Sequence, residues 1–336
     1  MIEQAHKGNL KGLNTLRFMA FFVIFLFHSF DIFSYGYLGV DLFFVLSSFL
    51  LTFLALKEIE LTHSFSQKNF FVRRALRIFP LYFFVVIALT VFLPILSNIY
   101  HLDISFPEKP YLYWTFLSNF DKSNHIFALK FLWSIAVEEQ FYILFLGLSF
   151  FFTRSIWIPI SILLVSYFIY MSYSNTYFLD TYSHVVPHFA NFAIGMIMAW
   201  LFYYKRMTLD FKIIFCLICG LFAYLFYDLA IVFNICFSFF IGGIIVSMIE
   251  SYEVFPILSK IFYPTEILGR YSYGLYVYSG IIITFGKKYL PYQNELMIFF
   301  IELIVLFIVS ILSYHIFEKR FIDMKKRFYK KKSDYF

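Results

Sequence analysis

The feature that most restricts the fold of this chain is a succession of apolar stretches, each about 20 residues long. A helix needs about that many residues to cross the hydrocarbon core of a bilayer, which is roughly 30 Å thick. Stretches such as 18–27 are apolar at every position, so the alternating pattern of a transmembrane β-barrel is absent and helices are predicted. We predict about ten spans, near residues 14–34, 37–56, 79–98, 132–152, 156–173, 184–203, 211–228, 231–249, 269–286 and 296–316.

The overall composition supports a lipid environment. Hydrophobic residues make up 61% of the 336 positions and charged residues only 14%. A soluble domain of this length could not bury so much apolar surface around one core. The sequence therefore predicts an all-α, polytopic transmembrane helix bundle in the cell (inner or plasma) membrane, built as a single domain over residues 1–336.

The positive charges predict the orientation of the bundle. With ten spans and a cytoplasmic N-terminus, most lysines and arginines fall in cytoplasmic segments, as the positive-inside rule requires. Both termini are therefore predicted to be cytoplasmic, and residues 319–336 form a basic cytoplasmic tail. Lysine clusters beside a last span usually meet anionic lipid, so membrane lipid is the expected partner of this tail and nucleic acid is not.

Arg17 and His28 are ionisable residues within the first predicted span. They are eleven positions apart, which on a helix places them on one face and about 16 Å apart along the axis. Arg17 alone could be a residue that snorkels to the interface and ends the span. His28 lies deeper, where an ionisable side chain usually faces a cavity or a polar partner. Burial without a counter-charge would keep its imidazole neutral, the form that a general base requires.

Asp41 lies near the start of the second predicted span. The connection around Ser34 to Gly36 is short, so the second helix is predicted to run antiparallel to the first and to bring Asp41 to the depth of His28. A carboxylate that accepts the imidazole N–H would fix the tautomer and stabilise the charge formed during proton transfer. The alternative is a structural aspartate that bonds to a neighbouring backbone group or serine.

Arg73, Arg74 and Arg77 cluster at the cytoplasmic end of the third predicted span. Spacings of three and four residues place their guanidinium groups on one side of a helical turn, next to a predicted helix break at Pro80. Guanidinium clusters bind phosphates through bidentate, charge-assisted hydrogen bonds. The alternative is a positive-inside anchor.

Glu138 and Glu139 are adjacent carboxylates a short way into the fourth predicted span. Their burial in hydrocarbon costs several kcal/mol unless they line a wet cavity or pair with cations. Adjacent helical residues point about 100° apart, so we expect one to face a cavity and the other to brace a neighbouring helix. The sequence does not decide which one faces the cavity.

Taken in order, these motifs resemble the acyltransferase-3 family of integral membrane acyltransferases. The resemblance rests on Arg17 with ten residues before His28, on 36–47 with Asp41, on 73–82, on 133–142 with Trp133, Ser134, Glu138 and Glu139, on 268–276 with Tyr273 and Tyr276, and on 313–319. Each motif alone is degenerate, whereas all of them in this order are specific.

The resemblance implies transfer of an acyl group, commonly acetyl, from cytoplasmic acyl-CoA to a hydroxyl of an envelope or exported glycan or a lipid-linked sugar. His28, with Asp41, would be the general base, and Glu138 or Glu139 would bind the sugar or pair with an arginine. The CoA phosphates would be held by Arg17, Arg73, Arg74 and Arg77, and substrate contacts would come from Trp133, Ser134, Tyr273 and Tyr276. No metal is expected.

Three departures from the family pattern are visible. Ser279 stands where the family often has a histidine, Arg320 where it often has proline, and Ser48 where glycine is frequent. The loss of the second histidine gives His28 more weight as the base. The alternatives to an enzyme are a transporter or flippase for a lipid-linked glycan, which also needs charges in a cavity, and a degenerate member that serves as an assembly partner.

Overall fold

The computed structural model describes residues 10–30, 34–123, 125–177, 182–204, 209–226, 229–290 and 294–328. In these ranges the chain is helical and holds no strand, so the all-α prediction is confirmed. The chain divides into two compact units, each assembled from separate segments. Unit 1 comprises Met1–Ile24, Tyr35–Phe65 and Gly147–Arg270, and unit 2 comprises Phe25–Ser34, Ser66–Leu146 and Tyr271–Phe336. The single domain over residues 1–336 stays a prediction.

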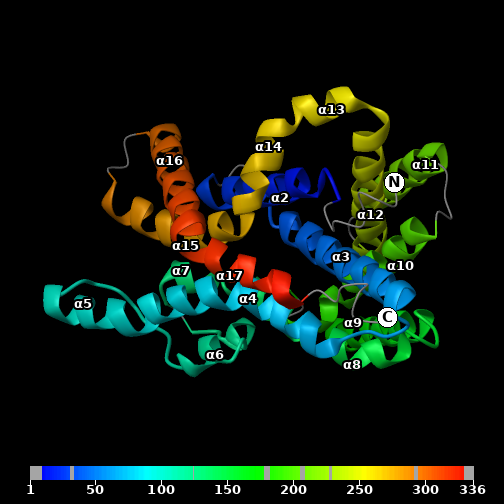
Figure 1. Cartoon of the computed structure of the whole chain (residues 1–336). Helices are drawn as coiled ribbons and strands as arrows, with labels where there is room; N and C mark the ends of the chain where they lie inside the picture. Colours follow the sequence, from blue (N-terminus) through cyan, green and yellow to red (C-terminus); the bar gives the residue numbers. More distant parts are fainter. Residues whose placement is uncertain are drawn as a thin grey trace. The chain divides into compact units, whose positions relative to one another are not determined.

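Unit 1 is a bundle of long helices (Figure 1). Its central helix, α10, packs against α3, α9 and α12, and α11 packs along α12. The first residues of α2 also belong to it. The bounds are α2 Leu13–Ser29, α3 Leu38–Thr62, α9 Trp157–Tyr177, α10 Phe189–Tyr203, α11 Leu209–Leu225, α12 Ala230–Val254, α13 Pro256–Ile261 and α14 Tyr263–Leu268, with the short η3 Ser149–Phe151 and η4 Val186–His188.

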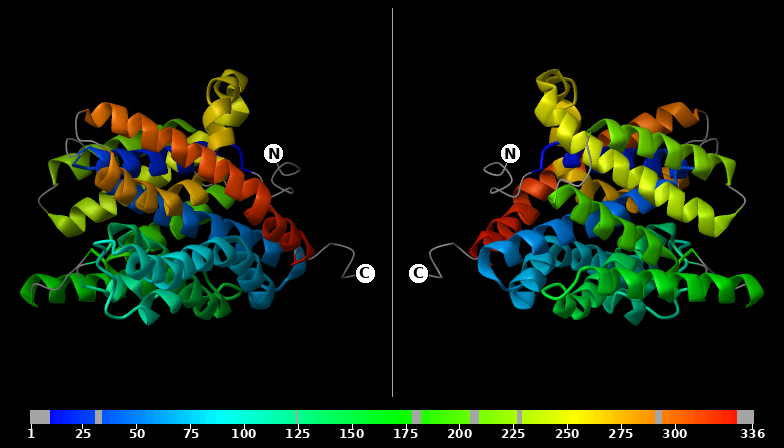
Figure 2. Two further views of the ribbon diagram at one scale, coloured as in Figure 1. Left: turned by 90° about the vertical axis from the view of Figure 1, so that its left-hand side faces the viewer. Right: turned by 90° about the vertical axis from the view of Figure 1, so that its right-hand side faces the viewer.

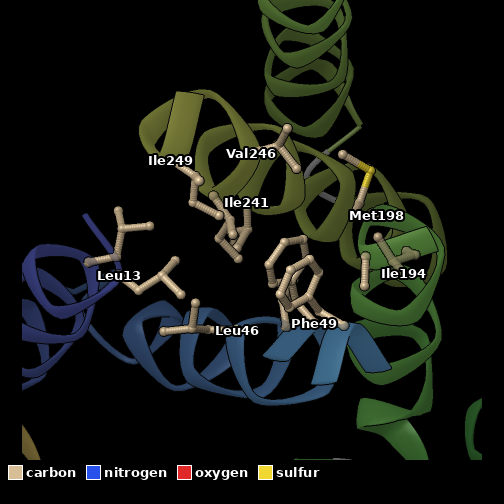
Figure 3. Packing of buried hydrophobic residues seen from close by; sticks show 13 residues of the cluster. Leu13, Leu46, Phe49, Ile194, Met198, Ile241, Val246 and Ile249 are labelled. Atoms are coloured by element: carbon tan, nitrogen blue, oxygen red, sulfur yellow. The ribbon is translucent and has the colours of Figure 1, made fainter. Parts of the chain in front are cut away.

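The core of unit 1 lies where α3, α10 and α12 meet the start of α2 (Figure 3). Phe49 of α3 is fully buried and points toward the apolar side chains of α10 and α12. Gly195 permits the close approach of α10 to α3, because a Cβ there would lie 2.5 Å from the carbonyl oxygen of Val45. The contact is therefore one between helix backbones, with large side chains filling the space on either side.

Unit 2 is built around α4 and the pair α15 and α16, which run side by side in both views of Figure 2. The C-terminal α17 and η7 pack against α4, and α7 packs against α15. The bounds are α4 Gln67–Ile87, η1 Ala88–Phe92, α5 Leu93–Tyr100, α6 Tyr111–Trp114, η2 Ser118–Phe120, α7 Phe127–Lys130, α8 Trp133–Leu148, η5 Gly269–Tyr271 at the junction with unit 1, α15 Ser272–Tyr289, α16 Glu295–Ser313, η6 Tyr314–Glu318, α17 Lys319–Met324 and η7 Lys325–Phe328.

The predicted helix break at Pro80 is wrong. The helix α4 runs without interruption from Gln67 to Ile87 and contains Pro80 in its interior. A proline removes one backbone hydrogen bond and crowds the preceding turn, yet membrane helices tolerate it where neighbouring groups satisfy the backbone. The arginine cluster therefore lies in the middle of a continuous helix.

Six helical segments of the described chain are long and apolar enough to cross a membrane: Leu38–Thr62, Gln67–Tyr100, Phe127–Phe151, Val186–Tyr203, Ala230–Tyr252 and Glu295–Met324. Shorter apolar helices cover Leu13–Ser29, Trp157–Tyr173 and Ile214–Leu225. The predicted ranges 211–228 and 231–249 are two helices, α11 and α12, that pack together. The total of about ten spans, the cytoplasmic ends and the cytoplasmic location of the basic tail at 319–336 stay predictions. Residues 329–336 of that tail lie outside the described residues.

Candidate functional site

Arg17 and His28 lie on one continuous helix, α2, as their spacing predicted. The Arg17 guanidinium donates to Asn14 Oδ1 at 2.9 Å, and Asn14 Nδ2 donates to Glu266 Oε1 at 3.0 Å. Glu266 also accepts from the backbone N–H of Thr15 at 3.2 Å. A carboxylate therefore caps the N-terminus of α2, where the helix dipole favours negative charge. The sequence carried no signal for Glu266, because it lies about 250 positions from its partners.

The His28 imidazole is surrounded by phenyl rings. Its ring centroid is 4.7 Å from that of Phe27, 5.2 Å from that of Phe127 and 4.6 Å from that of Phe131. The Lys287 ammonium donates to the backbone carbonyl oxygen of His28 at 2.9 Å. A cation at the last turn of a helix stabilises the carbonyl groups that end it. We call Phe27, Phe127 and Phe131 the aromatic collar of His28. Sequence reasoning missed Phe127, Phe131 and Lys287.

Asp41 is buried and belongs to a polar network in unit 1. Asn191 Nδ2 donates to Asp41 Oδ1 at 2.5 Å, and Ser238 Oγ donates to Asn191 Oδ1 at 2.9 Å. His188 Nδ1 lies 3.4 Å from Asp41 Oδ1, while His188 Nε2 lies 2.9 Å from the carbonyl oxygen of Tyr182. The network joins α3, α10 and α12 and was not predicted. The predicted pairing of Asp41 with His28, which belongs to unit 2, stays a prediction.

We expect Asp41→Ala to destabilise the protein by about 1–3 kcal/mol, because Asn191 and His188 would lose a buried acceptor. The measurement is the thermal midpoint of unfolding in detergent. The matched control is Asp41→Asn, which keeps an acceptor oxygen for Asn191 and should unfold close to the wild type. An unchanged midpoint in Asp41→Ala would show that the network does not stabilise the fold.

Ser134, Tyr273 and Tyr276, predicted as substrate contacts, lie within unit 2 at the junctions between its helices. The hydroxyls of Ser134 and Tyr276 are 2.6 Å apart, and Tyr276 also donates to the carbonyl oxygen of Phe131 at 3.2 Å. Tyr273 donates to the carbonyl oxygen of Ile78 at 2.9 Å. These bonds tie α15 to α8 and α4. Contact of Trp133, Ser134, Tyr273 and Tyr276 with a substrate stays a prediction.

Glu138 and Glu139 have different surroundings. Tyr142 donates a short hydrogen bond to Glu138 Oε1, and the Arg74 guanidinium lies over the Tyr142 ring at 5.6 Å from its centroid. Glu139 is 4% exposed, and its Oε1 makes no hydrogen bond within the described part of the chain. Glu138 is thus linked through Tyr142 to the arginine cluster, while Glu139 is the buried member of the pair.

The arginine cluster occupies the middle of α4. Arg73 donates to the carbonyl oxygen of Phe328 at 2.8 Å, which fixes the η7 segment against α4. Arg74 also lies 5.8 Å from the centroid of the Phe70 ring. Arg77 is one turn further along the helix, directly before Ile78, to whose carbonyl α15 is bonded.

Helix α15 connects the arginine cluster with His28. Near its start Tyr273 binds the carbonyl oxygen of Ile78, and near its end Lys287 binds the carbonyl oxygen of His28. Fourteen residues separate Tyr273 from Lys287, which is about 21 Å along the helix axis. Ser279, in place of the family histidine, is buried and donates to the carbonyl oxygen of Tyr276 at 2.6 Å. Its hydroxyl is thus used within α15.

The loop between α5 and α8 is held by a network of buried polar groups. Tyr113 donates to Asp121 Oδ2 at 3.0 Å, and His125 Nε2 lies 2.8 Å from the Tyr113 hydroxyl and 3.3 Å from Asp121 Oδ2. Burial raises the pKa of the Asp121 carboxyl, but hydrogen bonds from Ser123 and Tyr113 outweigh burial and leave this pKa below its usual value. The ionised carboxylate therefore stabilises the loop.

A lowered carboxyl pKa means that this stabilisation is present above the ordinary aspartate pKa of about 3.9 and is lost as the pH falls through the lower pKa of the folded state. We therefore expect hydrogen exchange in residues 102–123 to stay slow between about pH 5 and 7 and to accelerate below about pH 4, after correction for intrinsic rates. In Asp121→Asn the acid-induced increase should disappear. An increase of the same size in that variant would assign the transition to another group.

Comparison with known proteins gives the family. The profile of a protein family described as an acyltransferase domain matches residues 10–315. The chain belongs to this acyltransferase family. Its motifs had indicated the same family, so that prediction is confirmed.

Two curated relatives of this chain come from Staphylococcus aureus. O-acetyltransferase OatA of strain NCTC 8325 / PS 47 is 29% identical over 353 residues, which cover 92% of this chain and 56% of the relative. SACOL0978 of strain COL, named an O-acetyltransferase by inference, is 27% identical over 350 residues, covering 93% of this chain and 57% of the relative. The chain thus spans just over half the length of these relatives. No solved structure matches the chain significantly.

The described residues hold no group of three or more His, Cys, Asp or Glu side chains that could bind a metal ion. The expectation of a mechanism without a metal stays a prediction. The acyltransferase family implies an acyl donor in general.

Proposed function

We propose that this membrane acyltransferase moves an acyl group, most simply acetyl, from acyl-CoA on the cytoplasmic side to a hydroxyl of an envelope or exported glycan. The enzyme would act in the cell (inner or plasma) membrane, with membrane lipid around it. The observation that supports this proposal most is the course of α15, which is bonded beside the arginine cluster at one end and to His28 at the other.

The arginine cluster would bind the donor. Arg73, Arg74 and Arg77 of α4 present cations suited to the phosphates of CoA, and Arg73 also binds the carbonyl oxygen of Phe328. A contribution of Arg17 to this site stays a prediction. The pantetheine arm would then extend along α15 toward His28. CoA carries several negatively charged phosphates, so a group of cations on one helix is complementary to it in charge.

His28 would act as the general base. Its imidazole removes the proton of the acceptor hydroxyl while that oxygen forms a bond to the thioester carbonyl carbon. The carbon–sulfur bond then breaks, and the CoA thiolate takes up the proton from the imidazolium. The products are an O-acyl ester and free CoA. The aromatic collar would exclude water from the imidazole, and Lys287 would hold the end of α2 that carries it.

Glu138 and Glu139 would have different roles, one at the donor site and one toward a substrate hydroxyl. Glu138, bonded to Tyr142, would help to position Arg74 through the ring of that tyrosine. Glu139 would remain available for a substrate hydroxyl, because its Oε1 makes no hydrogen bond in the described ranges. Asp41 would assist His28 only if the predicted pairing forms, and it otherwise stabilises unit 1 through Asn191.

Inside-out membrane vesicles test the proposed function. Labelled acetyl-CoA is added outside these vesicles, and the glycan fraction is isolated and counted. We expect label on glycan in vesicles that contain the protein and none in vesicles that lack it. Movement of unmodified glycan without transfer of label would instead indicate a transporter or flippase. A missing O-acetyl resonance in the surface polysaccharide of cells without the protein would identify the acceptor.

A further inference from the structure

A cavity of about 200 Å³ lies in unit 2, between the loop that follows α5 and the end of α15. The loop contributes Asp103, Ser105 and His125, and the helix contributes Thr284, Phe285 and Lys288. Asp103, Ser105 and Lys288 are exposed, whereas His125 is buried. The cavity therefore opens to the surface and has a buried wall.

The walls of this cavity are fixed by hydrogen bonds. The backbone N–H of Ile126 donates to the carbonyl oxygen of Ser105 at 2.9 Å, which closes the loop on itself. Lys288 donates a short bond to the carbonyl oxygen of Asp103, which fastens the loop to α15. His125 is held by Tyr113 and by the carbonyl oxygen of Ile126. A site with fixed walls loses little conformational entropy when a ligand binds.

Both walls of the cavity adjoin, along the chain, residues that contact His28. On the loop side, Ile126 lines the cavity and the following residue, Phe127, belongs to the aromatic collar, with its ring 5.2 Å from the imidazole. On the helix side, Lys288 lines the cavity and the preceding residue, Lys287, binds the carbonyl oxygen of His28. The cavity is thus lined by the chain neighbours of two residues that contact His28.

The lining suits a sugar ring. A carboxylate from Asp103 and the hydroxyl of Ser105 can accept hydrogen bonds from sugar hydroxyls, and the Lys288 ammonium can donate to ring or glycosidic oxygens. Phe285 offers an apolar surface to the C–H groups of a pyranose. Pockets for drug-sized ligands measure roughly 300–1,000 Å³, so this cavity fits about one sugar ring and is too small for acyl-CoA.

We propose that this cavity is the acceptor subsite, which binds one sugar ring of the glycan and presents a hydroxyl of that ring, or of the adjoining ring, toward His28. The inference rests on the proposed function and adds to it a location for the acceptor and residues that bind it. Asp103 and Ser105 are its binding residues in the loop, and Phe285 and Lys288 are its binding residues in α15.

The test uses the purified full chain in nanodiscs, where both membrane faces are open to solution. Labelled acetyl-CoA is the donor, and surface polysaccharide that has been chemically deacetylated is the acceptor at varied concentration. Ser105→Trp fills the cavity, and Asp103→Asn removes the carboxylate at constant size. Each has a control in the same loop outside the cavity lining: Leu117→Trp introduces the same indole ring at another position, and Glu108→Gln removes an exposed charge.

We expect Ser105→Trp to lower kcat/KM for the polysaccharide at least tenfold and Asp103→Asn to raise its KM several-fold. Binding of labelled acetyl-CoA in the absence of polysaccharide should equal that of the wild type in both variants, which shows that they are folded. Leu117→Trp and Glu108→Gln should match the wild type in every measurement. If kcat/KM for the polysaccharide is the same in Ser105→Trp as in Leu117→Trp, the inference is overturned.

The two proposals fail in different ways. If the wild-type protein transfers no label to polysaccharide, the proposed function fails, and direct binding of fluorescently labelled polysaccharide decides the subsite. Weaker binding to Ser105→Trp than to Leu117→Trp then supports the subsite. Equal binding to the two variants refutes it. If transfer occurs in the wild type and in Ser105→Trp alike, the proposed function stands and the subsite lies elsewhere.

Discussion

Replacing His28 by alanine is expected to lower the rate of acyl transfer at least about a hundred-fold, the contribution typical of a general base. The alcohol would have to attack the thioester without a group to take its proton. The effect should fall on kcat at saturating donor and acceptor, because neither the arginine cluster nor the cavity is altered. The measurement is a steady-state assay with labelled acetyl-CoA, after the amount of protein in the membrane has been equalised.

The control for this substitution is His184→Ala, which removes an imidazole that no part of the proposed mechanism uses. It should transfer at the wild-type rate. His28→Gln, which has a polar side chain of similar length but no basic nitrogen, should be as slow as His28→Ala. Activity close to that of the wild type in either His28 variant would refute the assignment of the base.

Replacing Arg73, Arg74 and Arg77 together by glutamine is expected to lower kcat/KM for acyl-CoA about a hundred-fold or more. Each charge-assisted hydrogen bond to a phosphate contributes about 1.5–3 kcal/mol, so the loss of even two of them has this size. The effect should appear mainly in KM for the donor, with little change in KM for the glycan. The wild-type KM should also rise with ionic strength, since salt screens the attraction between arginine and phosphate.

Lys68→Gln is the matched control, because it removes a positive charge from the first turn of the same helix. It should change KM for acyl-CoA less than about two-fold, the order expected for an exposed charge outside the site. Single variants separate the roles of the three arginines. Arg73→Gln should also loosen the η7 segment, because Arg73 binds the carbonyl oxygen of Phe328. Limited proteolysis of the C-terminal segment detects that change. A triple variant with unchanged KM for the donor would exclude the cluster as the CoA site.

The sequence predicted the features that depend on local geometry. Helical spacing placed Arg17 and His28 on one helix and grouped Arg73, Arg74 and Arg77 on another, and both groupings are present. The apolar runs predicted helices, and each predicted span contains one. These predictions succeeded because they compare residues within a few turns of each other, where the helix itself fixes the geometry.

The sequence could not predict which distant side chains complete each site. Asp41 binds Asn191, about 150 positions away, and His28 is bound by Lys287, about 260 positions away. No periodicity within a helix encodes such a contact, since it depends on how helices pack against one another. The helix break predicted at Pro80 was wrong for a related reason. The intrinsic preference of proline predicted a break, but the packed environment of α4 keeps the helix continuous.

The hydrogen bonds made by Tyr273 and Lys287 at the two ends of α15 fix the number of residues that can lie between these two positions. One residue inserted between Tyr273 and Lys287 would shift the later part of the helix by about 1.5 Å and turn it by about 100°. The lysine would then face away from the carbonyl of His28 while the tyrosine kept its partner. Aligned sequences of relatives that share both anchors should therefore differ between these positions by substitution and not by insertion or deletion.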